Sequence, residues 1–547
     1  MRKILFCLLL GTTLVSVGCS KKADRAEKAV ATNTDTTMTG SGSSAASEPG
    51  KAAVDEDRPA DPAPPEPEKA SDKKVADHAY GTTAKPAKDG LGGDNFKNYG
   101  QNPWVDATKD RLSTFAADVD TASYTIMRRK LNEGALPPAE SVRVEEFVNY
   151  FDYKFADPTN GTPFSVLMQA APSPMNAGRH ILRVGVATKA KTEQERKPAN
   201  LVFLVDVSGS MSGEDRLGLA KKSLRILTQN LKEGDTVSLV TYAGSSRVIL
   251  KPTSLDNKAR ILSAIDELSS GGSTAMGSGI DLAYEQAMMG KKPNTISRVI
   301  VLSDGDANVG SSTHDEILKT IAGRVKEGVT LSTIGFGMGN YKDETMEQLA
   351  NKGNGNNFYV DSIDAAKKIF DKQLGSTLEV VAKDAKFQVD FDPKLVSRYR
   401  LVGYENRDIA DNDFRNDKVD AGEIGAGHQV TALYEIELTT DGKQQNAPIA
   451  TVRIRHKAPN GEKAIEAAFP MIGGPAESFA NASADFRFAF SVAAFADLLR
   501  GGEDAEHWSL AEIRKVAIAA SGDDAERKEF VGLISKAITL KGRAASR

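Results

Sequence analysis

The chain has 547 residues, which exceeds what one hydrophobic core holds and predicts roughly two to four folded units joined by linkers. Its 40% hydrophobic and 26% charged residues are ordinary for a water-soluble protein. Because 70 Lys and Arg nearly balance 74 Asp and Glu, the net charge of −4 creates no field that would attract nucleic acid or an anionic membrane surface. We therefore expect neither of these electrostatic partners.

The first residues have the layout of a secretory signal peptide. Arg2 and Lys3 precede the apolar stretch 4–10. This stretch is too short to cross a bilayer as a helix, which needs about 20 residues. The two cysteines, Cys7 and Cys19, both lie in this N-terminal region, so disulfide frameworks, thiolate zinc sites and cysteine nucleophiles are excluded after residue 19.

The segment that ends at Cys19 resembles a bacterial lipobox, with Gly18 before the cysteine, although Ser16 stands where lipoboxes usually carry leucine. The resemblance implies that residues 1–18 are removed and that Cys19 becomes an acylated N-terminus. Ser20 after it resembles an outer-membrane sorting signal. The alternative is a soluble secreted protein in which Cys19 has no role.

Residues 19–100 are predicted to form the lipidated N-terminus and a disordered tether. Residues 20–79 contain no Leu, Ile, Phe, Trp or Tyr, so this stretch cannot bury enough apolar surface to offset the entropy lost on ordering. We expect a protein of the cell envelope that contacts the membrane through its lipid anchor only, at the outer membrane and facing the periplasm.

Order is expected to begin near Trp104, in an N-terminal flanking domain over residues 101–197. Helical periodicity and turn signals there predict two helices followed by two strands. These elements are expected at 124–131, 142–151, 164–170 and 180–187.

The pattern changes to alternating strands and helices over residues 198–376. Continuous apolar runs are typical of strands that are covered on both faces, so this segment predicts a doubly wound α/β fold with a mostly parallel sheet. The predicted strands are 201–205, 237–242, 299–302 and 331–335. The predicted helices are 217–231, 258–268, 279–289, 314–326, 344–352 and 365–374.

Residues 377–547 are predicted to be rich in strands and to end in a helical tail from residue 485. Strand-like runs occur at 386–391, 398–403, 429–438 and 449–455. Because strand-rich segments lie on both sides of the α/β segment, we hypothesise that they pair into one β-sandwich with the α/β module inserted between them.

Five oxygen-bearing side chains mark the candidate site. Asp206, Ser208 and Ser210 follow the first strand of the α/β segment, and Thr274 and Asp304 lie at the matching ends of later connections. Ligands bind beyond the carboxyl ends of the strands in this architecture. A small hard cation prefers oxygen ligands at about 2.0–2.1 Å. The two carboxylates would balance its charge, and the three hydroxyls would supply neutral oxygens and leave a position for an external ligand.

At these residues the chain resembles a von Willebrand factor type A domain, whose metal-ion-dependent adhesion site reads D-x-S-x-S, then Thr, then Asp. The resemblance implies that Asp206, Ser208, Ser210 and Thr274 bind Mg²⁺ directly or through water, and that Asp304 acts mostly through water. Mn²⁺ or Ca²⁺ is possible instead. A protein partner would complete the coordination sphere with an Asp or Glu carboxylate. A domain that kept the fold and lost the metal is the alternative.

The flanks carry a second resemblance. Residues 115–124, 143–151 and 427–435 are similar to the flanks of bacterial YfbK-type lipoproteins with a von Willebrand factor type A domain. These motifs identify relatives more than an activity. The partner, the choice of cation, the biological process and the oligomeric state stay open at this point.

Other functions are disfavoured by missing residues. A metal-assisted hydrolase would need a general base, and the sequence offers none among the converging residues, so we predict no catalytic residues and no enzymatic activity. A scaffold in which the metal is only structural is a second alternative. Residues 118–121 resemble the paired aspartates of haloacid-dehalogenase phosphatases, but a turn capped by Asp120 or Thr121 before a helix is the simpler interpretation.

Overall fold

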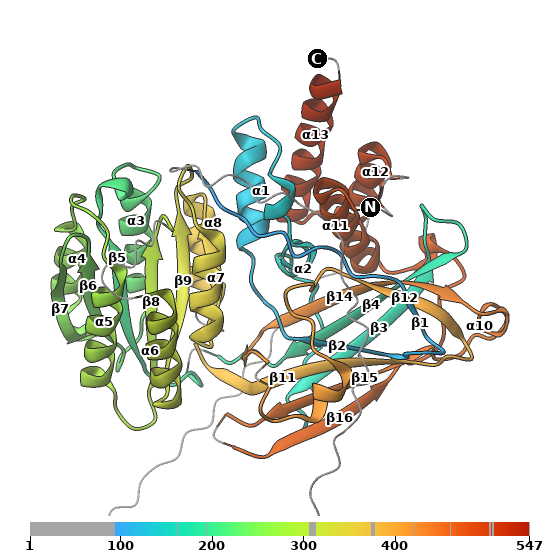
Figure 1. The fold of residues 1–547 in the computed structure, drawn as a ribbon, viewed down its shortest axis with the longest axis horizontal. Helices are drawn as coiled ribbons and strands as arrows, with labels where there is room; N and C mark the ends of the chain where they lie inside the picture. The colour runs from blue at the N-terminus through green and yellow to red at the C-terminus, as the bar shows by residue number, and fades with distance from the viewer. Residues whose placement is uncertain are drawn as a thin grey trace, which may run out of the picture. The chain divides into compact units, whose positions relative to one another are not determined.

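The structure, a computed structural model, describes residues 93–545 except 160, 193, 306–312, 374–377, 420, 460, 503–504 and 506–507. The predicted signal peptide, Cys19 and most of the predicted tether lie outside the described residues. The described chain forms a β-sandwich, an inserted α/β module and a group of helices (Figure 1). Among the described residues, no helix has both the length and the apolar character needed to cross a bilayer.

Two sheets build the sandwich. One has the strand order β1-β12-β14-β4-β3, and the other has the order β13-β11-β15-β16 with β2 beside β11. Alternate residues along β15 are buried, as expected where one face of a strand covers a core. The strands are β1 (Val105–Asp106), β2 (Leu112–Ala116), β3 (Phe164–Pro172), β4 (Arg179–Thr188), β11 (Val380–Phe391), β12 (Val396–Val402), β13 (Ile424–Gly425), β14 (Gln429–Leu438), β15 (Ala450–Lys457) and β16 (Ala464–Pro470).

Strands from before and after the module pair directly. β4 runs antiparallel to β14, from Arg179 opposite Glu437 to Ala187 opposite Gln429. β2 pairs with β11 in the other sheet. Leu182 on β4 and Tyr434 on β14 are both fully buried in the core that the two sheets share. The hypothesis of one sandwich built from both flanks is confirmed.

The module is a six-stranded sheet in the order β10-β9-β8-β5-β6-β7, parallel except for the antiparallel pair β6–β7. Helices cover both faces, with α3, α4 and α8 over one core and α5, α6 and α7 over the other (Figure 1). The predicted doubly wound α/β fold is confirmed. Its strands are β5 (Ala199–Asp206), β6 (Thr236–Tyr242), β7 (Ser246–Ser254), β8 (Ile296–Ser303), β9 (Val329–Phe336) and β10 (Asn357–Val360).

The helices of the module match the predicted positions closely. They are α3 (Leu217–Gln229), α4 (Lys258–Asp266), α5 (Met276–Gly290), α6 (His314–Lys326), α7 (Asp343–Lys352) and α8 (Ile363–Lys367), with short turns at η2 (Gly209–Met211), η3 (Leu255–Asn257) and the π-helical η4 (Lys368–Gln373). β7 and β10 were not predicted.

Helices from the two ends of the described chain share an aromatic core. Phe151 lies 4.9 Å from Phe488 and 5.6 Å from Phe530 between ring centroids, and Tyr124 lies 5.6 Å from Phe147. The predicted helical tail is therefore part of the folded body. The helices concerned are α1 (Ala122–Asn132), α2 (Val144–Asn149), α11 (Ala484–Arg500), α12 (Leu510–Ser521) and α13 (Ala525–Ala545). Shorter helices are η1 (Ala139–Ser141), η5 (Asp411–Arg415), α10 (Thr440–Gln444) and η6 (Phe479–Asn481).

A buried charge cluster joins the module to the flanks. The Arg407 guanidinium donates to Asp118 Oδ2 at 3.0 Å, to Asp120 Oδ2 at 3.1 Å and to Asn351 Oδ1 on α7 at 2.7 Å. Asp120 Oδ1 also accepts from the backbone N–H of Asn357 on β10, at 2.9 Å. Arg407 thus connects the segment before α1 with α7, and Asp120 connects it with β10.

Two further arginines extend this junction. Arg143 pairs with Glu146 beside it and with Asp343 at the start of α7. Arg128 on α1 binds Asp361 after β10 through two nitrogens, at 2.6 and 2.7 Å. All of these side chains are buried, so each charge depends on its partner instead of water. The module is fixed to the flanks through side chains, in addition to its two chain connections.

The predicted cap of the first helix is wrong. Thr121 occupies the N-cap position of α1, but its side chain makes no capping hydrogen bond. Asp120 binds Arg407 and Asn357 instead of the helix. Asp118 also forms a local turn, since its Oδ1 accepts from the backbone N–H of Asp120 at 2.9 Å. The paired aspartates at 118 and 120 therefore hold the junction with Arg407 as their cation.

The predicted tether ends too late, because residues 94–96 are bound to the module. Asp94 Oδ1 accepts from the backbone N–H groups of Gly339 at 2.7 Å and Tyr341 at 3.1 Å. Asn95 donates its backbone N–H to the Tyr341 carbonyl at 2.8 Å, and Phe96 packs against the small core around Tyr341. These contacts stabilise the segment despite its low apolar content.

His428 predicts an acid-sensitive component of stability. It is buried, its Nδ1 accepts from the backbone N–H of Gly425 at 3.1 Å, and burial, with the nearby Arg298 charge, lowers its pKa to about 3. An unfolded histidine titrates near pH 6.5, so the stability that neutral His428 provides is full above that pH and falls as the pH drops towards 3.

We expect His428→Asn to remove this component. The free energy of unfolding of the natural protein should fall, relative to the variant, by about 2–3 kcal/mol between pH 7 and about pH 4.5. Chemical denaturation at both pH values measures this. The quantity to compare is the difference in unfolding free energy between the natural protein and the variant. Burial raises the pKa of Glu145 to about 8, which makes stability change with pH in the opposite direction, but this effect is present in both proteins and cancels in the difference. Parallel pH profiles would contradict the prediction.

Candidate metal centre

The predicted ligands come from the centre of the module's sheet. β5 lies between β6 and β8, and its last residue, Asp206, stands opposite Tyr242, the last residue of β6. On the other side, Val205 is opposite Leu302 of β8, so Asp304 follows directly after the end of that strand. The strand order reverses here, since the chain passes from β5 to β6 on one side and continues with β8 on the other.

The first ligand loop is held by its own hydrogen bonds. Asp206 Oδ1 accepts from the backbone N–H of Ser208 at 2.9 Å, and the hydroxyls of Ser208 and Ser210 are 2.9 Å apart. Asp206 Oδ2 accepts from the Ser303 hydroxyl at 3.0 Å. These bonds place three predicted ligands together and connect them to the residue before Asp304. Ser303 was missed as a positioning residue, because a serine at the end of a buried strand carries no distinctive pattern.

The second ligand loop is tied to the first through backbone groups. Gly209 donates its N–H to the Gly272 carbonyl at 3.0 Å, and Gly271 donates to the Val207 carbonyl at 2.7 Å. Thr274 follows these glycines in the loop before α5 and is half-buried. Gly272 has a φ of +90°, a conformation that glycine adopts without strain. The loop with Thr274 therefore lies directly beside the loop with the two serines.

The third ligand loop is packed tightly. Asp304 is buried and is followed by Gly305, which has a φ of +81°. A Cβ at position 305 would lie 2.5 Å from the backbone nitrogen of Lys342, so only glycine fits. This contact sets Asp304 against the loop before α7, the same loop that Asp94 and Asn95 bind.

The electrostatics favour a cation at this place. Burial raises the pKa of Asp206 to about 6, and the neighbouring Asp304 carboxylate adds to the increase, while hydrogen bonds from Ser208 and Ser303 oppose it. Two buried carboxylates near each other repel, and a divalent cation would relieve that repulsion. The donor set contains only oxygen, as hard cations require. The described part contains no group of three or more His, Cys, Asp and Glu side chains that could hold a metal. At this site, hydroxyl ligands would therefore have to complete the coordination begun by the two carboxylates.

Arg216 connects the site to its surroundings and was not predicted. Its guanidinium donates to the Ser210 carbonyl at 3.0 Å and to the Met338 carbonyl, in the loop after β9, at 2.7 Å. The preceding residue, Asp215, pairs with Arg129 of α1 at 2.8 Å. The loop that carries the two serines is thus held by the module and by the flank together.

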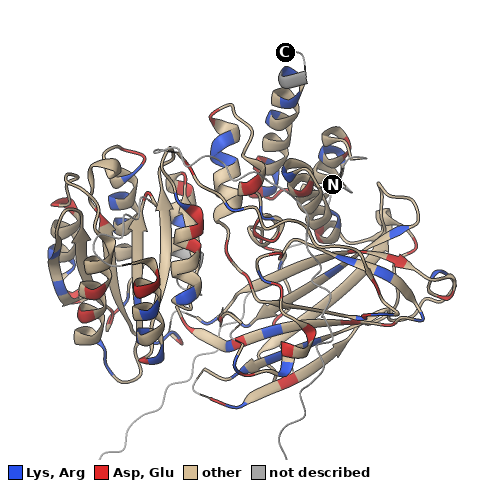
Figure 2. Ribbon diagram, viewed as in Figure 1, with Lys and Arg blue, Asp and Glu red and all other residues tan. Residues whose placement is uncertain are grey.

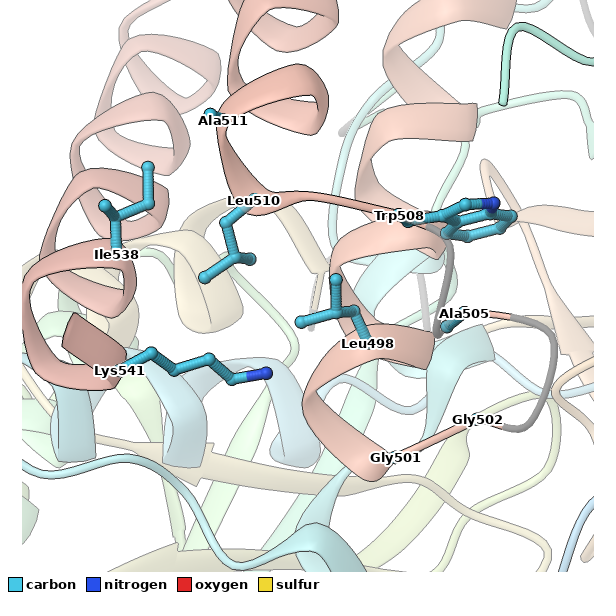
Figure 3. A pocket seen from close by; sticks show the side chains of 9 residues that line it. All are labelled: Leu498, Gly501, Gly502, Ala505, Trp508, Leu510, Ala511, Ile538 and Lys541. Carbon is cyan, nitrogen blue, oxygen red and sulfur yellow. The ribbon is translucent and has the colours of Figure 1, made fainter. Parts of the chain in front are cut away.

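A separate hollow of about 520 Å³ lies among the C-terminal helices. Figure 3 shows the Lys541 side chain pointing into it from α13, towards Leu498 of α11, with Ile538 and Leu510 above. Burial lowers the pKa of Lys541. Its lining residues all lie between 498 and 541, so it shares no residue with the candidate metal centre.

Family models match three consecutive parts of the chain. The model of the von Willebrand factor type A domain matches residues 200–372 and so covers the module. A model described as von Willebrand factor matches residues 91–183, and the model of the C-terminal part of uncharacterized protein YfbK matches residues 376–540. Together these models span both flanks and the module.

Two relatives align with large parts of the same residues. Uncharacterized protein YfbK of Escherichia coli strain K12 is 39% identical over 470 residues, which are 81% of this chain and 80% of that protein. Uncharacterized protein sll0103 of Synechocystis is 26% identical over 283 residues, which are 51% of this chain and 66% of that protein.

Solved structures show more distant similarity. A von Willebrand factor type A protein from Catenulispora acidiphila has a TM-score of 0.40 at 15% identity and covers 68% of this chain and 89% of its own. BatB from Bacteroides thetaiotaomicron has a TM-score of 0.27 at 20% identity and covers 32% of this chain and 96% of its own. The relative of 39% identity and the family models show that the chain belongs to the YfbK-type proteins with a von Willebrand factor type A domain.

Proposed function

We propose that this protein binds a protein partner through a divalent cation held by Asp206, Ser208, Ser210, Thr274 and Asp304. The partner supplies an Asp or Glu carboxylate to the cation, and no bond of the partner is broken. Mg²⁺ is the expected ion, with Mn²⁺ or Ca²⁺ as substitutes. The protein acts in the cell envelope, at the outer membrane facing the periplasm, where an acylated Cys19 anchors it.

One observation supports the proposal above the others. Asp206 is buried at the end of the central strand, accepts from Ser208 and Ser303, and has its pKa raised by burial and by Asp304. Two buried carboxylates repel each other, and a bound cation would remove that repulsion. They lie beside several hydroxyls at the end of the strands where ligands bind in this architecture. The chain's residues would hold the ion and orient its open face towards the partner.

The direct test is a capture experiment from envelope extract. The full chain is immobilised and exposed to the extract with MgCl₂ or with EDTA. We expect a defined partner to bind in Mg²⁺ and to be released by EDTA, because the partner's carboxylate needs the ion as its acceptor. Capture that is equal in EDTA would contradict the proposal.

Chelation also separates the proposal from a purely structural role of the metal. Suppose that the ion serves binding and that free Mg²⁺ is present at ten times its Kd. Chelating the ion then lowers the free energy of unfolding by only about 1.4 kcal/mol, and the partner is released. A scaffold whose fold depends on the metal would lose much more stability and would release nothing. Thermal unfolding with and without EDTA, measured beside partner release, decides between the two.

A further inference from the structure

A groove opens beside the candidate metal centre, between α3 and the segment 268–270, with a volume of about 620 Å³. One wall begins at Gly213 and Glu214, shortly after Ser210. The other wall ends at Ser270, immediately before the glycines that precede Thr274. Both walls therefore continue the two loops that carry the hydroxyl ligands, so the groove adjoins the candidate metal centre along the chain.

The groove carries more positive than negative charge. Lys221, Lys222 and Arg225 line it from α3. In Figure 2, basic positions on the ribbon are blue and acidic positions are red. Lys222 pairs with Glu214 at 2.9 Å, and Arg225 pairs with Asp266. The side chains of these pairs are between 41% and 85% exposed, so each ion pair contributes little stability and its members can exchange partners.

Lys221 differs from its two neighbours on α3. Its Nζ donates to the backbone carbonyls of Asp266 and Leu268, at 2.8 and 2.9 Å. These acceptors are backbone carbonyls at the end of α4, and the nearest carboxylate that feels the ammonium is Glu214, which is paired with Lys222. An ammonium has three donors, and two are used here, which leaves one for a further acceptor. Among the lining residues of the groove, three cations face one carboxylate, that of Glu214, while Asp266 and Glu267 lie beside the segment 268–270.

We propose that the partner's contact segment is acidic beyond its metal-binding carboxylate, and that a second Asp or Glu of that segment lies in this groove against Lys221 and Arg225. The inference rests on the proposed function, since the first carboxylate sets the position of the segment. With a divalent cation balancing Asp206 and Asp304, the lining of the groove presents more cations than carboxylates to the partner.

The test uses synthetic probes and the full chain. Fluorescein-labelled Gly/Ser peptides carry either a single Asp or an Asp with one Glu added at successive positions. Fluorescence anisotropy measures their binding in MnCl₂, and electron paramagnetic resonance measures Mn²⁺ binding itself. We expect the best diacidic peptide to bind about fivefold more tightly than the single-Asp peptide, as one well-placed ion pair allows.

Three variants locate the effect. Lys221→Ala with Arg225→Ala should reduce the diacidic advantage to less than about twofold, with Mn²⁺ binding unchanged. Ser270→Trp, at an exposed position of the opposite wall, should do the same by filling the groove without changing its charge. Lys319→Ala, at an exposed position of α6 over the other face of the sheet, is the matched control and should keep the full advantage.

The outcomes separate this inference from the function on which it rests. If Mn²⁺ binds at the site but both peptides bind equally, bind not at all, or keep their difference in the groove variants, the acidic-segment inference is wrong and the metal site stands. If Mn²⁺ binding does not depend on Asp206, the proposed function itself is wrong.

Discussion

Replacing Asp206 with asparagine is expected to lower the affinity for Mg²⁺ or Mn²⁺ by more than about 100-fold and to abolish cation-dependent partner capture. The side chain supplies one of only two carboxylates in the donor set, and its charge cannot be replaced by the hydroxyls. Asparagine keeps an oxygen that can accept from Ser208, so the loop conformation is retained while the charge is lost. Asp206→Ala should lose binding equally and should also leave the Ser208 and Ser303 donors without their acceptor.

Isothermal titration with Mn²⁺ and capture from envelope extract measure the two effects. Asp281→Asn, which removes an exposed carboxylate from α5, is the matched control and should bind the ion and the partner normally. Cation binding by Asp206→Asn that equals the natural protein would show that the ion, if any, binds elsewhere.

Replacing Arg407 with alanine is expected to destabilise the protein by about 3–5 kcal/mol, since it leaves the buried carboxylates of Asp118 and Asp120 without their cation. Burial and the charge of Asp118 already raise the pKa of Asp120, and Arg407 opposes that increase. Without the arginine, the buried carboxylates of the folded variant take up protons more readily, and protonation at low pH removes their unpaired charge. The loss of unfolding free energy should therefore be larger at pH 8 than at pH 5.

Urea denaturation at these two pH values, followed by the fluorescence of Trp104 and Trp508, gives the free energy of unfolding. The control is Arg415→Ala, which removes an arginine that is 64% exposed and paired with Glu466, and which should cost less than about 1 kcal/mol. Equal losses in the two variants would mean that the buried junction adds no more stability than a surface ion pair.

The module could be predicted because the patterns that mark its strands and ligands lie in short, continuous stretches of sequence. Continuous apolar runs marked β5, β6, β8 and β9, and β5 is followed at once by three of the five candidate ligands. The two strands that were missed have weaker patterns. β10 has only four residues, and β7 is an antiparallel edge strand in which exposed and partly buried residues predominate.

The junction could not be predicted, because its partners are far apart in sequence. Asp118 and Arg407 are separated by 289 residues, and Arg143 and Asp343 by 200. A short acidic motif before a helix favours a local cap in any single-sequence reading. Only the fold brings Arg407 to that position. The supporting residues Ser303 and Arg216 were missed for the same reason, since their roles depend on which loops become neighbours.

The pairing of β4 with β14 has a consequence for synthesis. The two strands are separated by more than 200 residues, so the first half of the sandwich emerges from the ribosome long before its partner strands exist. The module between them has local strand order and can fold early, whereas β4 must wait with the edge that will pair with β14 still unpaired. We therefore expect slow maturation of the sandwich, and an exposed edge of β4 that can pair with other chains until β14 has been made.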